Sequence, residues 1–374
     1  MSKLFSPFAL RDLTLRNRAI VAPMCQYSAI DGLANDWHFA HLSRFALGGF
    51  SLVLLEATGV SPEARISYAD LGLWKDEQIA PLKRIVDFLH SQHTAAGIQL
   101  AHAGRKASTS VGFHKGLDPA SVGYEHWTPV APSAIAHSDN ADFQTPTALD
   151  EAGLKHVVTS FVDATKRADA AGFDTVEIHA AHGYLLNQFL SPLANKRTDN
   201  YGGSRENRMR LPLEVVEAVR AAWPEGKPLL VRISTSDNAE GGWQVEDSVV
   251  FAKALKTLGV DLVHCSSGGF AEGTIKPEPL YQVAFAKGVR DGAKIATAAV
   301  GLISTPEDAE EIIASGEADV VAFARAALDD PNWALHAQQV LDASAQDYSL
   351  WPAQAGARIK DRDRVLHIRG FATV

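Results

Sequence analysis

Short apolar runs alternate along the chain with longer segments in which apolar side chains recur every three or four positions. The short runs are rich in Val, Ile and Leu, which is typical of buried β-strands, and helical periodicity follows each of them. The predicted strands lie at residues 19–22, 51–57, 97–101, 174–180, 228–233, 260–265, 294–298 and 319–323. The predicted helices include residues 37–47, 78–93, 150–171, 204–222, 245–258, 281–289 and 306–315. A strand–helix unit that is repeated eight times predicts the α/β fold class and, within it, a (β/α)8 TIM barrel.

Polar residues at the predicted helix starts support these boundaries. Asp150 and Ser204 each come directly before a helical pattern, as N-cap residues do. Thr305 is followed by Pro306 and then by Asp308, which combines a cap, a proline in the first turn and early negative charge. We therefore expect helices to begin after Asp150, Ser204 and Thr305.

The whole chain, residues 1–374, is predicted to form a single barrel domain with additions at its two ends. Residues 1–18 alternate weakly around two leucines and are expected to form a hairpin cap that closes the amino end of the barrel. Long insertions at 103–147 and 182–203 follow strands at the catalytic end, and loops of this length are more often functional than idle. The tail, residues 351–374, is basic, so we expect a solvated terminus or a contact with a neighbouring subunit.

Composition and charge exclude several classes of partner. The chain has 374 residues, 46% of them hydrophobic, with a net charge of −9 and a pI near 5.9. A nucleic acid or an anionic membrane would favour a basic surface, so neither is expected, and a small-molecule partner fits better. The first residues lack the apolar core of a secretory signal, and no apolar run approaches the ~20 residues of a membrane span. A cytoplasmic location is therefore expected.

The cysteine and glycine patterns narrow the possibilities further. Only Cys25 and Cys265 are present, far apart in the sequence, so a disulfide framework is not indicated and a reducing compartment is expected. A lone cysteine is most often an inert small hydrophobe, which stays an alternative to a chemical role for Cys25 and is the interpretation for Cys265. No GxGxxG motif follows a predicted strand, so dinucleotide binding of the Rossmann type is not supported.

The predicted strands carry residues with possible chemical roles at or just past their carboxyl ends, where the active site of a TIM barrel lies. These residues are Pro23, Met24, Cys25, Tyr27, Ala57, Gln99, His102, His179, His182, Arg232, Ser266, Ser267, Gly268, Gly269, Ala299, Val300, Gly301, Ala324 and Arg325. The loops after the seventh and eighth strands commonly bind phosphate, because small residues let backbone N–H groups approach an anion and an arginine adds charge. The chain has this pattern at Gly301 and Arg325, which predicts a phosphorylated ligand.

The stretch 174–184 carries the strongest chemical signal. Two imidazoles and a phenol, His179, His182 and Tyr184, gather at the end of one strand and offer donors to an oxygen together with a proton source. Hydrogen-bond donors and a proton source are the groups that the activation of a carbonyl compound requires. A zinc site is disfavoured, because the histidines are three positions apart with only alanines between them, and no metal is expected. The histidines could instead satisfy backbone groups in a loop, and Tyr184 could be a packed aromatic.

Arg232 is predicted to point into the barrel, where an unpaired charge is costly. An ion pair with Glu177 inside the barrel is one interpretation. The other is that Arg232 stabilises negative charge on a bound ring, since charge near one edge of a flavin tunes its electronics. The two interpretations are compatible.

Five motifs enclose most of these residues. They are PMCQY at 23–27, EATGVSPEARIS at 56–67, GIQLAHAGRKAS at 97–108, EIHAAHGYLLNQFLSP at 177–192 and NKRTDNYGGSRENRMR at 195–210. With them the chain resembles, from about Leu4 to Arg369, the old yellow enzyme family of FMN-dependent ene reductases. It looks most similar to the subgroup with a cysteine near the flavin, typified by the xenobiotic reductases and the thermophilic-type members.

The resemblance implies a role for each matching residue. The implied FMN-binding residues are Ala22, Pro23, Met24, Cys25, Ala57, Gln99, Arg232, Gly301, Ala324 and Arg325. The first seven would contact or border the ring system, and the last three would lie around the phosphate. Ala324 departs from the family, which usually has glycine at this position, and adds a methyl group beside the phosphate.

The resemblance also implies the substrate site and the assembly. His179 and His182 would hydrogen-bond the activating oxygen of the substrate, Tyr184 would be the proton donor and Tyr27 would line the site. Cys25 would act in catalysis by tuning the flavin potential and the fit of the substrate. A homodimer or a dimer-based tetramer is implied, in which Arg369 crosses to the active site of the neighbouring protomer.

The implied reaction begins with the reduction of FMN by NADPH or NADH. An enone, enal, maleimide or nitro compound then enters the same pocket, receives a hydride from flavin N5 at its β-carbon and is protonated by Tyr184 at its α-carbon. Two other classes stay open on the residues alone. One is a metal-dependent or Schiff-base barrel lyase that acts on a phosphorylated substrate through His179 and His182 or through Lys106, and the other is a flavin-binding protein without turnover.

Overall fold

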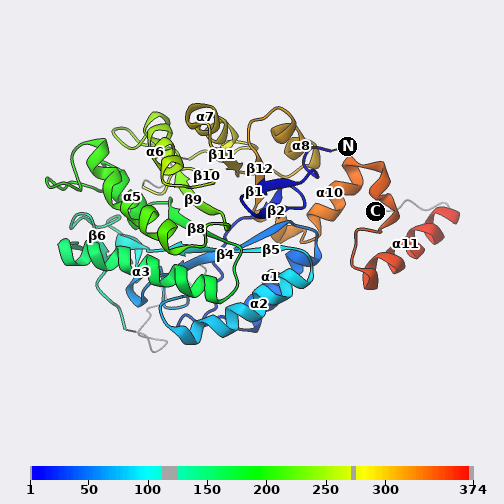
Figure 1. The fold of residues 1–374 in the computed structure, drawn as a ribbon, viewed down its shortest axis with the longest axis horizontal. Coiled ribbons are helices and arrows are strands. Elements are labelled where there is room, and N and C mark those ends of the chain that lie inside the picture. The colour runs from blue at the N-terminus through cyan, green and yellow to red at the C-terminus, as the bar shows by residue number, and fades with distance from the viewer. Residues whose placement is uncertain (1, 112–124, 271–274, 370–374) are drawn as a thin grey trace.

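Eight parallel strands close into a barrel in the computed structural model, which describes residues 2–111, 125–270 and 275–369 (Figure 1). The barrel strands are β3 (Ala19–Val21), β4 (Leu52–Gly59), β5 (Ala95–Ala101), β8 (Thr175–Ala180), β9 (Leu229–Ser234), β10 (Leu262–Ser266), β11 (Ala296–Ala299) and β12 (Val320–Phe323). They follow one another around the barrel in chain order, and β12 pairs with β3 to close it. The predicted (β/α)8 barrel is confirmed.

Helices surround the barrel on its outside (Figure 1). Those between the strands are α1 (Asp36–Leu47), α2 (Ile79–Ser91), α3 (Glu151–Ala170), α5 (Arg205–Ala222), α6 (Val245–Thr257), α7 (Val283–Ala293) and α8 (Pro306–Ala314). The side chains of Asp150, Ser204 and Thr305 each accept a hydrogen bond from a backbone N–H of the first turn, at 2.8, 3.2 and 3.1 Å. The three predicted caps are confirmed, and each is worth about 1 kcal/mol.

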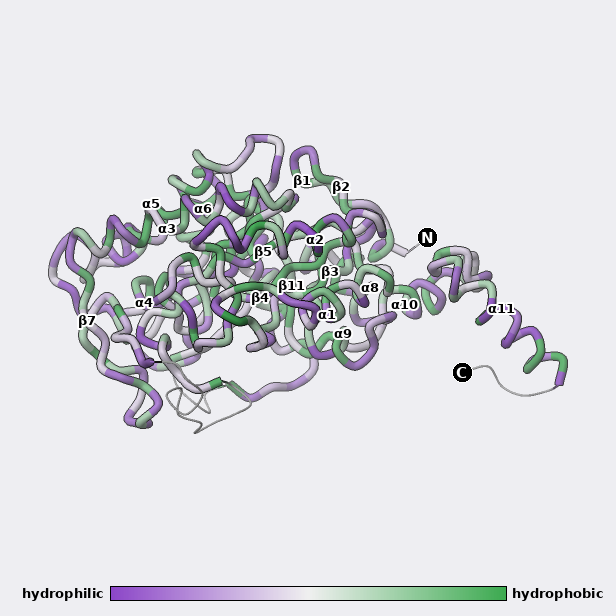
Figure 2. Tube along the Cα trace, turned by 90° about the horizontal axis from the view of Figure 1, so that it is seen from below, coloured by the Kyte–Doolittle hydropathy of each residue, from purple (hydrophilic) through white to green (hydrophobic). Residues whose placement is uncertain are grey.

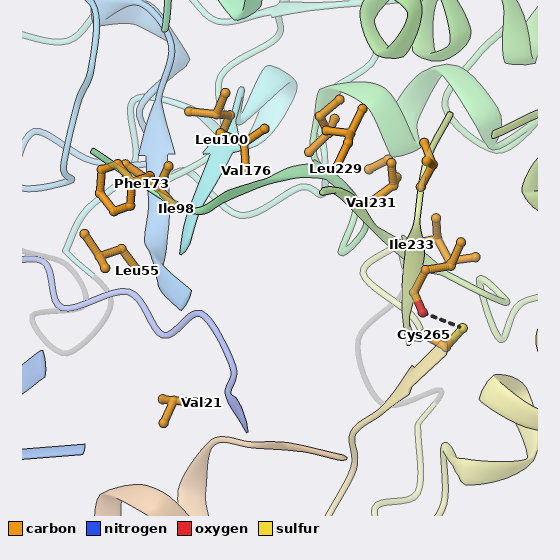
Figure 3. Close-up of a cluster of buried hydrophobic side chains, with 14 of the residues drawn as sticks. Val21, Leu55, Ile98, Leu100, Phe173, Val176, Leu229, Val231, Ile233 and Cys265 are labelled. Atoms are coloured by element: carbon orange, nitrogen blue, oxygen red, sulfur yellow. Dashed lines mark hydrogen bonds between the residues drawn. The ribbon is translucent and has the colours of Figure 1, made fainter. Parts of the chain in front are cut away.

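The two faces of the strands pack into different apolar clusters. The outward face contacts the helices, and Figure 3 shows residues of this cluster, among them Val21, Val231 and Cys265. The inward face near the amino ends packs against the hairpin of β1 (Phe8–Leu10) and β2 (Leu13–Leu15). The expected hairpin cap is confirmed, because its leucines share a buried cluster with the amino-end residues of the barrel strands.

Four α-helices of the structure were not predicted. They are α4 (Leu185–Leu190), α9 (Arg325–Asp329), α10 (Trp333–Leu341) and α11 (Ala353–Ile368). The helix predicted at 281–289 begins later, at Val283, and runs on to Ala293 before a left-handed cap at Lys294. The tail was expected to be a solvated terminus or to contact a neighbouring subunit, and most side chains of α11 are exposed. The helix itself was missed because it lacks an apolar stripe.

The insertion 103–147 contains a short 3-10 helix, η3 (Gly104–Lys106), and a small parallel pair, β6 (Val130–Ala131) with β7 (Thr147–Ala148). Residues 112–124 of this insertion and residues 370–374 of the tail lie outside the described residues. Within the described ranges, no helix is both long and apolar enough to cross a membrane.

Candidate active site

The strand register brings polar side chains together inside the barrel. Gln99 on β5 is level with Glu177 on β8, and Arg232 on β9 is level with both His179 on β8 and His264 on β10. Register partners on neighbouring strands point to the same face, so these side chains form one buried layer. None of the five is more than 8% exposed.

A β-bulge places one more of the predicted residues on this inner face. Leu55 and Ala57 are two positions apart, so in a regular strand both would point outward into the helices. The register shifts between them, and Ala57 is level with Gln99 instead. The extra residue, Glu56, accepts a hydrogen bond from the backbone N–H of Gln26 at 2.8 Å. The bulge therefore turns Ala57 inward and fixes the loop that carries Cys25 and Tyr27.

The two histidines and the tyrosine lie together at the carboxyl end of β8. The ring of His179 is 5.1 Å from that of His182 and 5.1 Å from that of Tyr184, in edge-to-face orientations. The Nδ1 atom of His179 is buried and has no hydrogen-bond partner among the described residues. An unpaired buried polar atom costs free energy, so a bound ligand that supplies the missing hydrogen bond would be stabilised at this position.

A tight turn fixes His182. Its backbone has φ near +60°, and Gly183 follows at +71°, where a Cβ atom would lie only 2.2 Å from the carbonyl oxygen of Gly269. The backbone N–H of His182 donates to Ser234 Oγ at 2.8 Å, and Lys106 Nζ donates to the carbonyl of His182 at 2.9 Å. Three neighbouring elements, η3, β9 and the loop after β10, thus hold this turn in place.

Burial sets the protonation states of these groups. It lowers the pKa of His179 and of His182 well below the usual range, and the charge of Arg232 lowers both further. It raises the pKa of the Tyr184 phenol well above the usual range. At neutral pH the site therefore holds two uncharged imidazoles, which can donate hydrogen bonds, and a phenol that keeps its proton.

Partly buried side chains form an apolar wall beside these groups. We use this name for Cys25, Tyr27, Trp127 and Tyr184, which pack together on a small buried cluster. Burial raises the pKa of the Cys25 thiol well above its usual range, and the charges of Asp70 and Glu56 raise it further. The thiol therefore stays neutral, which suits contact with a ring better than nucleophilic attack. The structure brings Cys25, Tyr27 and Tyr184 together on one cluster.

A cavity of about 310 Å³ opens at the ends of β9 to β12, and its size is ordinary for a small-molecule site. It is lined by His182, Arg232, Ser266, Ser267, Tyr281, Gln282, Val300, Gly301, Leu302, Ile303, Ser304, Ala322, Ala324, Arg325 and Ala326. Buried polar atoms of three of these residues, Arg232 Nε, Ser267 Oγ and Gln282 Oε1, have no partner among the residues described. Gly301 has φ +123°, and a Cβ atom there would crowd Gln282. These features fit a phosphorylated ligand.

The other predicted residues lie around this cavity or away from it. Ala22, Pro23 and Met24 directly follow β3, at the same end of the barrel. Ala57 borders a small void that Tyr184 also lines. Arg369 is exposed at the end of α11, which extends away from the barrel, so it is not part of the site of its own chain (Figures 1 and 2).

Two features of the site were missed or misjudged from the sequence. The direct ion pair considered between Arg232 and Glu177 does not form, because His264 takes its place beside Glu177 at 2.9 Å. His264 was not singled out, although its alternation with Val263 and Cys265 in the strand would have placed it inside the barrel. Among the described residues, no group of three or more His, Cys, Asp or Glu side chains has the arrangement of a metal site.

The fold and the cavity define the class of (β/α)8 barrels that bind a phosphorylated ligand at the ends of their last strands. The sequence profile of the NADH:flavin oxidoreductase / NADH oxidase family matches residues 3–344, and the chain belongs to this family, the old yellow enzymes. The resemblance inferred from the five motifs is confirmed at the level of the family. The chain is accordingly an FMN-dependent NAD(P)H oxidoreductase.

Relatives of known name support this assignment. An NADPH dehydrogenase of Listeria monocytogenes is 48% identical over 343 residues, which cover 91% of this chain and 96% of the relative. An NADPH dehydrogenase of Bacillus cytotoxicus is 44% identical, with coverage of 94% and 98%. Among solved structures, morphinone reductase is 29% identical with a TM-score of 0.76 and covers 91% of this chain and 90% of its own.

Proposed function

We propose that this enzyme reduces the activated C=C bond of α,β-unsaturated carbonyl or nitro compounds with NAD(P)H as the reductant. The observation that carries the proposal is the cluster of His179, His182 and Tyr184, with the unpartnered Nδ1 atom of His179, beside an arginine-lined cavity. FMN bound in this cavity would supply the redox chemistry, as the acceptor of a hydride from the nicotinamide and the donor of a hydride to the β-carbon.

The two imidazoles act on the oxygen of the substrate. Because both are uncharged and partly or fully buried, each can donate one N–H to the carbonyl or nitro oxygen. Negative charge grows on this oxygen as the β-carbon gains its hydride, so the donors bind the transition state more tightly than the substrate. One such donor is typically worth about 3 to 4 kcal/mol of the barrier.

Tyr184 completes the addition. Its phenol O–H gives a proton to the α-carbon, and the phenolate then recovers a proton from solvent before the next turnover. The high pKa of this phenol keeps the proton in place until the electron-rich α-carbon is available. Positioned acid catalysis of this kind contributes roughly 10² to 10⁴ in rate.

The residues that would hold FMN divide into two groups. Gly301, Ala324 and Arg325 line the cavity at the ends of β11 and β12 and are proposed to bind the phosphate. The proposed contacts of the ring system are Ala22, Pro23, Met24, Cys25, Ala57, Gln99 and Arg232. Tyr27 is proposed to line the substrate pocket, because it belongs to the same apolar wall as Cys25 and Tyr184.

The structure of α11 supports the proposed assembly. Gly356 is its one buried residue, while Val365 and Ile368 are 46% and 72% exposed. A helix that extends from the barrel with exposed apolar side chains suits contact with a second protomer, as a homodimer or a dimer-based tetramer. We propose that Arg369 at its end reaches the active site of the neighbour.

An absorbance spectrum followed through one cycle tests the proposed function. The purified protein should show an oxidised flavin spectrum that bleaches when NADPH is added without oxygen and returns when cyclohexenone follows. Morphinone reductase has been solved in complex with tetrahydroNAD, a nicotinamide analogue. A spectrum that NADPH bleaches but that neither an enone, a maleimide nor a nitroalkene restores would contradict the proposal.

A further inference from the structure

Glu177 is a fully buried carboxylate with no role in the reaction described above. Its Oε1 atom accepts a hydrogen bond from Gln99 Nε2 at 2.7 Å, and its Oε2 atom contacts His264 Nδ1 at 2.9 Å. None of the three side chains is more than 2% exposed. Burial alone would raise the pKa of Glu177, but His264, Arg232 and Gln99 outweigh this effect and lower the pKa, so the carboxylate is ionised.

Arg232 is the cation that this charge balances, because burial lowers the pKa of His264 and leaves that imidazole uncharged. Arg232 and Glu177 do not themselves form an ion pair. Arg232 lies one strand away from Glu177, level with His264, and its guanidinium faces the cavity. Its Nε atom has no hydrogen-bond partner in the described part of the chain. The carboxylate is instead engaged by His264 and Gln99.

This separation has a physical consequence. A Coulomb interaction inside a protein acts over many ångströms, whereas a hydrogen bond needs a donor and an acceptor within about 3.2 Å. A carboxylate in direct contact would neutralise Arg232 and also occupy the N–H groups that a ligand needs. Held at a distance by His264, Glu177 lowers the cost of burying Arg232 and leaves those N–H groups free.

The same carboxylate fixes the orientation of Gln99. An ionised carboxylate only accepts hydrogen bonds, so the side-chain group of Gln99 that faces it must be the NH2 group. The carbonyl oxygen of Gln99 is thereby left for another partner. Glu177 thus acts on both polar residues that are proposed to face the flavin ring from inside the barrel.

We propose that Glu177 is a detached counter-ion and positioning residue that sets the reduction potential of the bound cofactor, through the net charge at Arg232 and the orientation of Gln99. The inference rests on the proposed contacts of Arg232 and Gln99 with the FMN ring. Reduction adds negative charge to the ring, and uncompensated positive charge nearby favours the reduced form. Glu177 therefore keeps the potential lower than Arg232 alone would set it.

The test is the midpoint potential of Glu177→Gln, which removes the charge and keeps the shape and the acceptor for Gln99. At a fixed solution potential, the ratio of reduced to oxidised flavin should rise at least tenfold, which is a positive shift of about 30 mV for two electrons. In Glu177→Asp, which keeps the charge, the ratio of reduced to oxidised flavin should stay within threefold of the wild-type ratio. A Glu177→Gln ratio within twofold of the wild type would overturn the proposal.

A matched control removes the same charge elsewhere. Glu310 on α8 accepts hydrogen bonds from the backbone N–H groups of Lys3 and Leu4, in the segment beside the amino end of the barrel. Glu310→Gln should leave the potential unchanged, although both variants lose one hydrogen-bonded carboxylate. An equal shift in both variants would mean that net charge or altered stability, and not the position of Glu177, moves the potential.

A second variant covers the case in which Glu177→Gln does not fold. Glu177→Met has a similar volume, removes the same charge, buries no new polar group and keeps Arg232, so its ratio of reduced to oxidised flavin should show the same tenfold rise. A Glu177→Met ratio within twofold of the wild type would refute the proposal. Failure of the proposed function is distinguishable, because it would appear in the wild type as a flavin that no activated alkene reoxidises, whatever the potential of the variants.

Discussion

His182 and Ser266 lie in hydrogen-bond contact, with 2.8 Å between the Nε2 atom of the ring and the hydroxyl oxygen. The neutral imidazole has one N–H and one bare nitrogen, and its partner decides which is which. A Ser266 hydroxyl that donates to Nε2 keeps the ring proton on Nδ1, the nitrogen that is left to face a substrate. The last residue of β10 would thereby select which nitrogen is the donor in the turn after β8.

Replacing Ser266 by alanine should impair the half-reaction with the alkene. Without the hydroxyl, the ring of His182 is no longer held in one tautomer and orientation. A buried polar atom that loses its partner typically costs about 1 to 3 kcal/mol, which is roughly 10- to 100-fold in rate. The rate of enone-dependent flavin reoxidation, measured by stopped flow at saturating enone, should fall by this factor. Ser266→Thr keeps the hydroxyl and should recover most of the rate. An unchanged rate in Ser266→Ala would remove the positioning role, provided that the FMN content matches that of the wild type.

Tyr184→Phe should separate the two halves of the cycle. The variant keeps the aromatic ring beside His179 and loses only the proton that the α-carbon needs. Flavin reduction by NADPH should stay near normal, while reoxidation by the enone slows roughly 10² to 10⁴-fold. Equal slowing of both halves would show that the phenol acts in binding and not as the acid.

Arg325→Ala should weaken the binding of FMN selectively. Arg325 lines the cavity and begins α9, and a charge-assisted contact with a phosphate is worth about 1.5 to 3 kcal/mol. The dissociation constant of FMN from the reconstituted apoprotein should therefore rise about 10- to 100-fold. Riboflavin lacks the phosphate and should bind the variant and the wild type equally. Equal losses for FMN and riboflavin would place Arg325 away from the phosphate.

The barrel was predictable because its strands are buried on both faces. Such strands appear in the sequence as short continuous apolar runs, and polar caps such as Asp150 and Thr305 mark where the helices begin. Helix α11 carries no such signal. Its side chains are polar on most sides, so neither a stripe of apolar residues nor a cap identified it before the structure was known.

The site was predictable to the extent that single strands define it. The alternation within β8 correctly placed Glu177 and His179 on one face. Contacts between strands were harder to predict, because they depend on the register of the strands. A shift of one residue moves every side chain of a strand to the opposite face of the sheet. The bulge that turns Ala57 inward and the pairing of Glu177 with His264 both depend on register, and the sequence carries no local signal for either.

Several histidines are buried uncharged, and their contribution should lower the stability of the native state as the pH falls below neutral. Burial lowers the pKa of His41 and of His102 to about 4, while the unfolded chain takes up protons near pH 6.5. Above pH 6.5 neither state is protonated and these residues contribute nothing. As the pH falls from 6.5 towards 4, the unfolded state gains protons that the native state cannot bind, at a cost of about 1 kcal/mol for each histidine by pH 5.5.

The thermal unfolding midpoint at pH 7.5 and pH 5.5 measures this effect. The unfolding midpoint of His41→Phe should fall less between pH 7.5 and pH 5.5 than that of the wild type, because one proton-linked group is gone. A phenyl ring at this position can keep the ring contacts with Trp37 and Phe45. His367→Gln on exposed α11 is the control and should leave the difference unchanged. A loss as large in His41→Phe as in the wild type would exclude His41 as a source of the dependence.

Arg369→Ala should weaken substrate binding without affecting the barrel. If α11 carries Arg369 to the neighbouring active site, the variant keeps its mass in solution and its unfolding midpoint, while the KM for the enone rises severalfold. Arg358→Ala, nearer the start of the same helix, removes an equal charge and should leave KM unchanged. Unchanged kinetics in Arg369→Ala would contradict the proposed contact of Arg369 with the neighbouring active site.

Removal of residues 353–374 should convert the assembly to monomers, which light scattering would show, and should raise the KM for the enone at least as much as Arg369→Ala does. A truncated chain that stays oligomeric would place the interface elsewhere on the barrel.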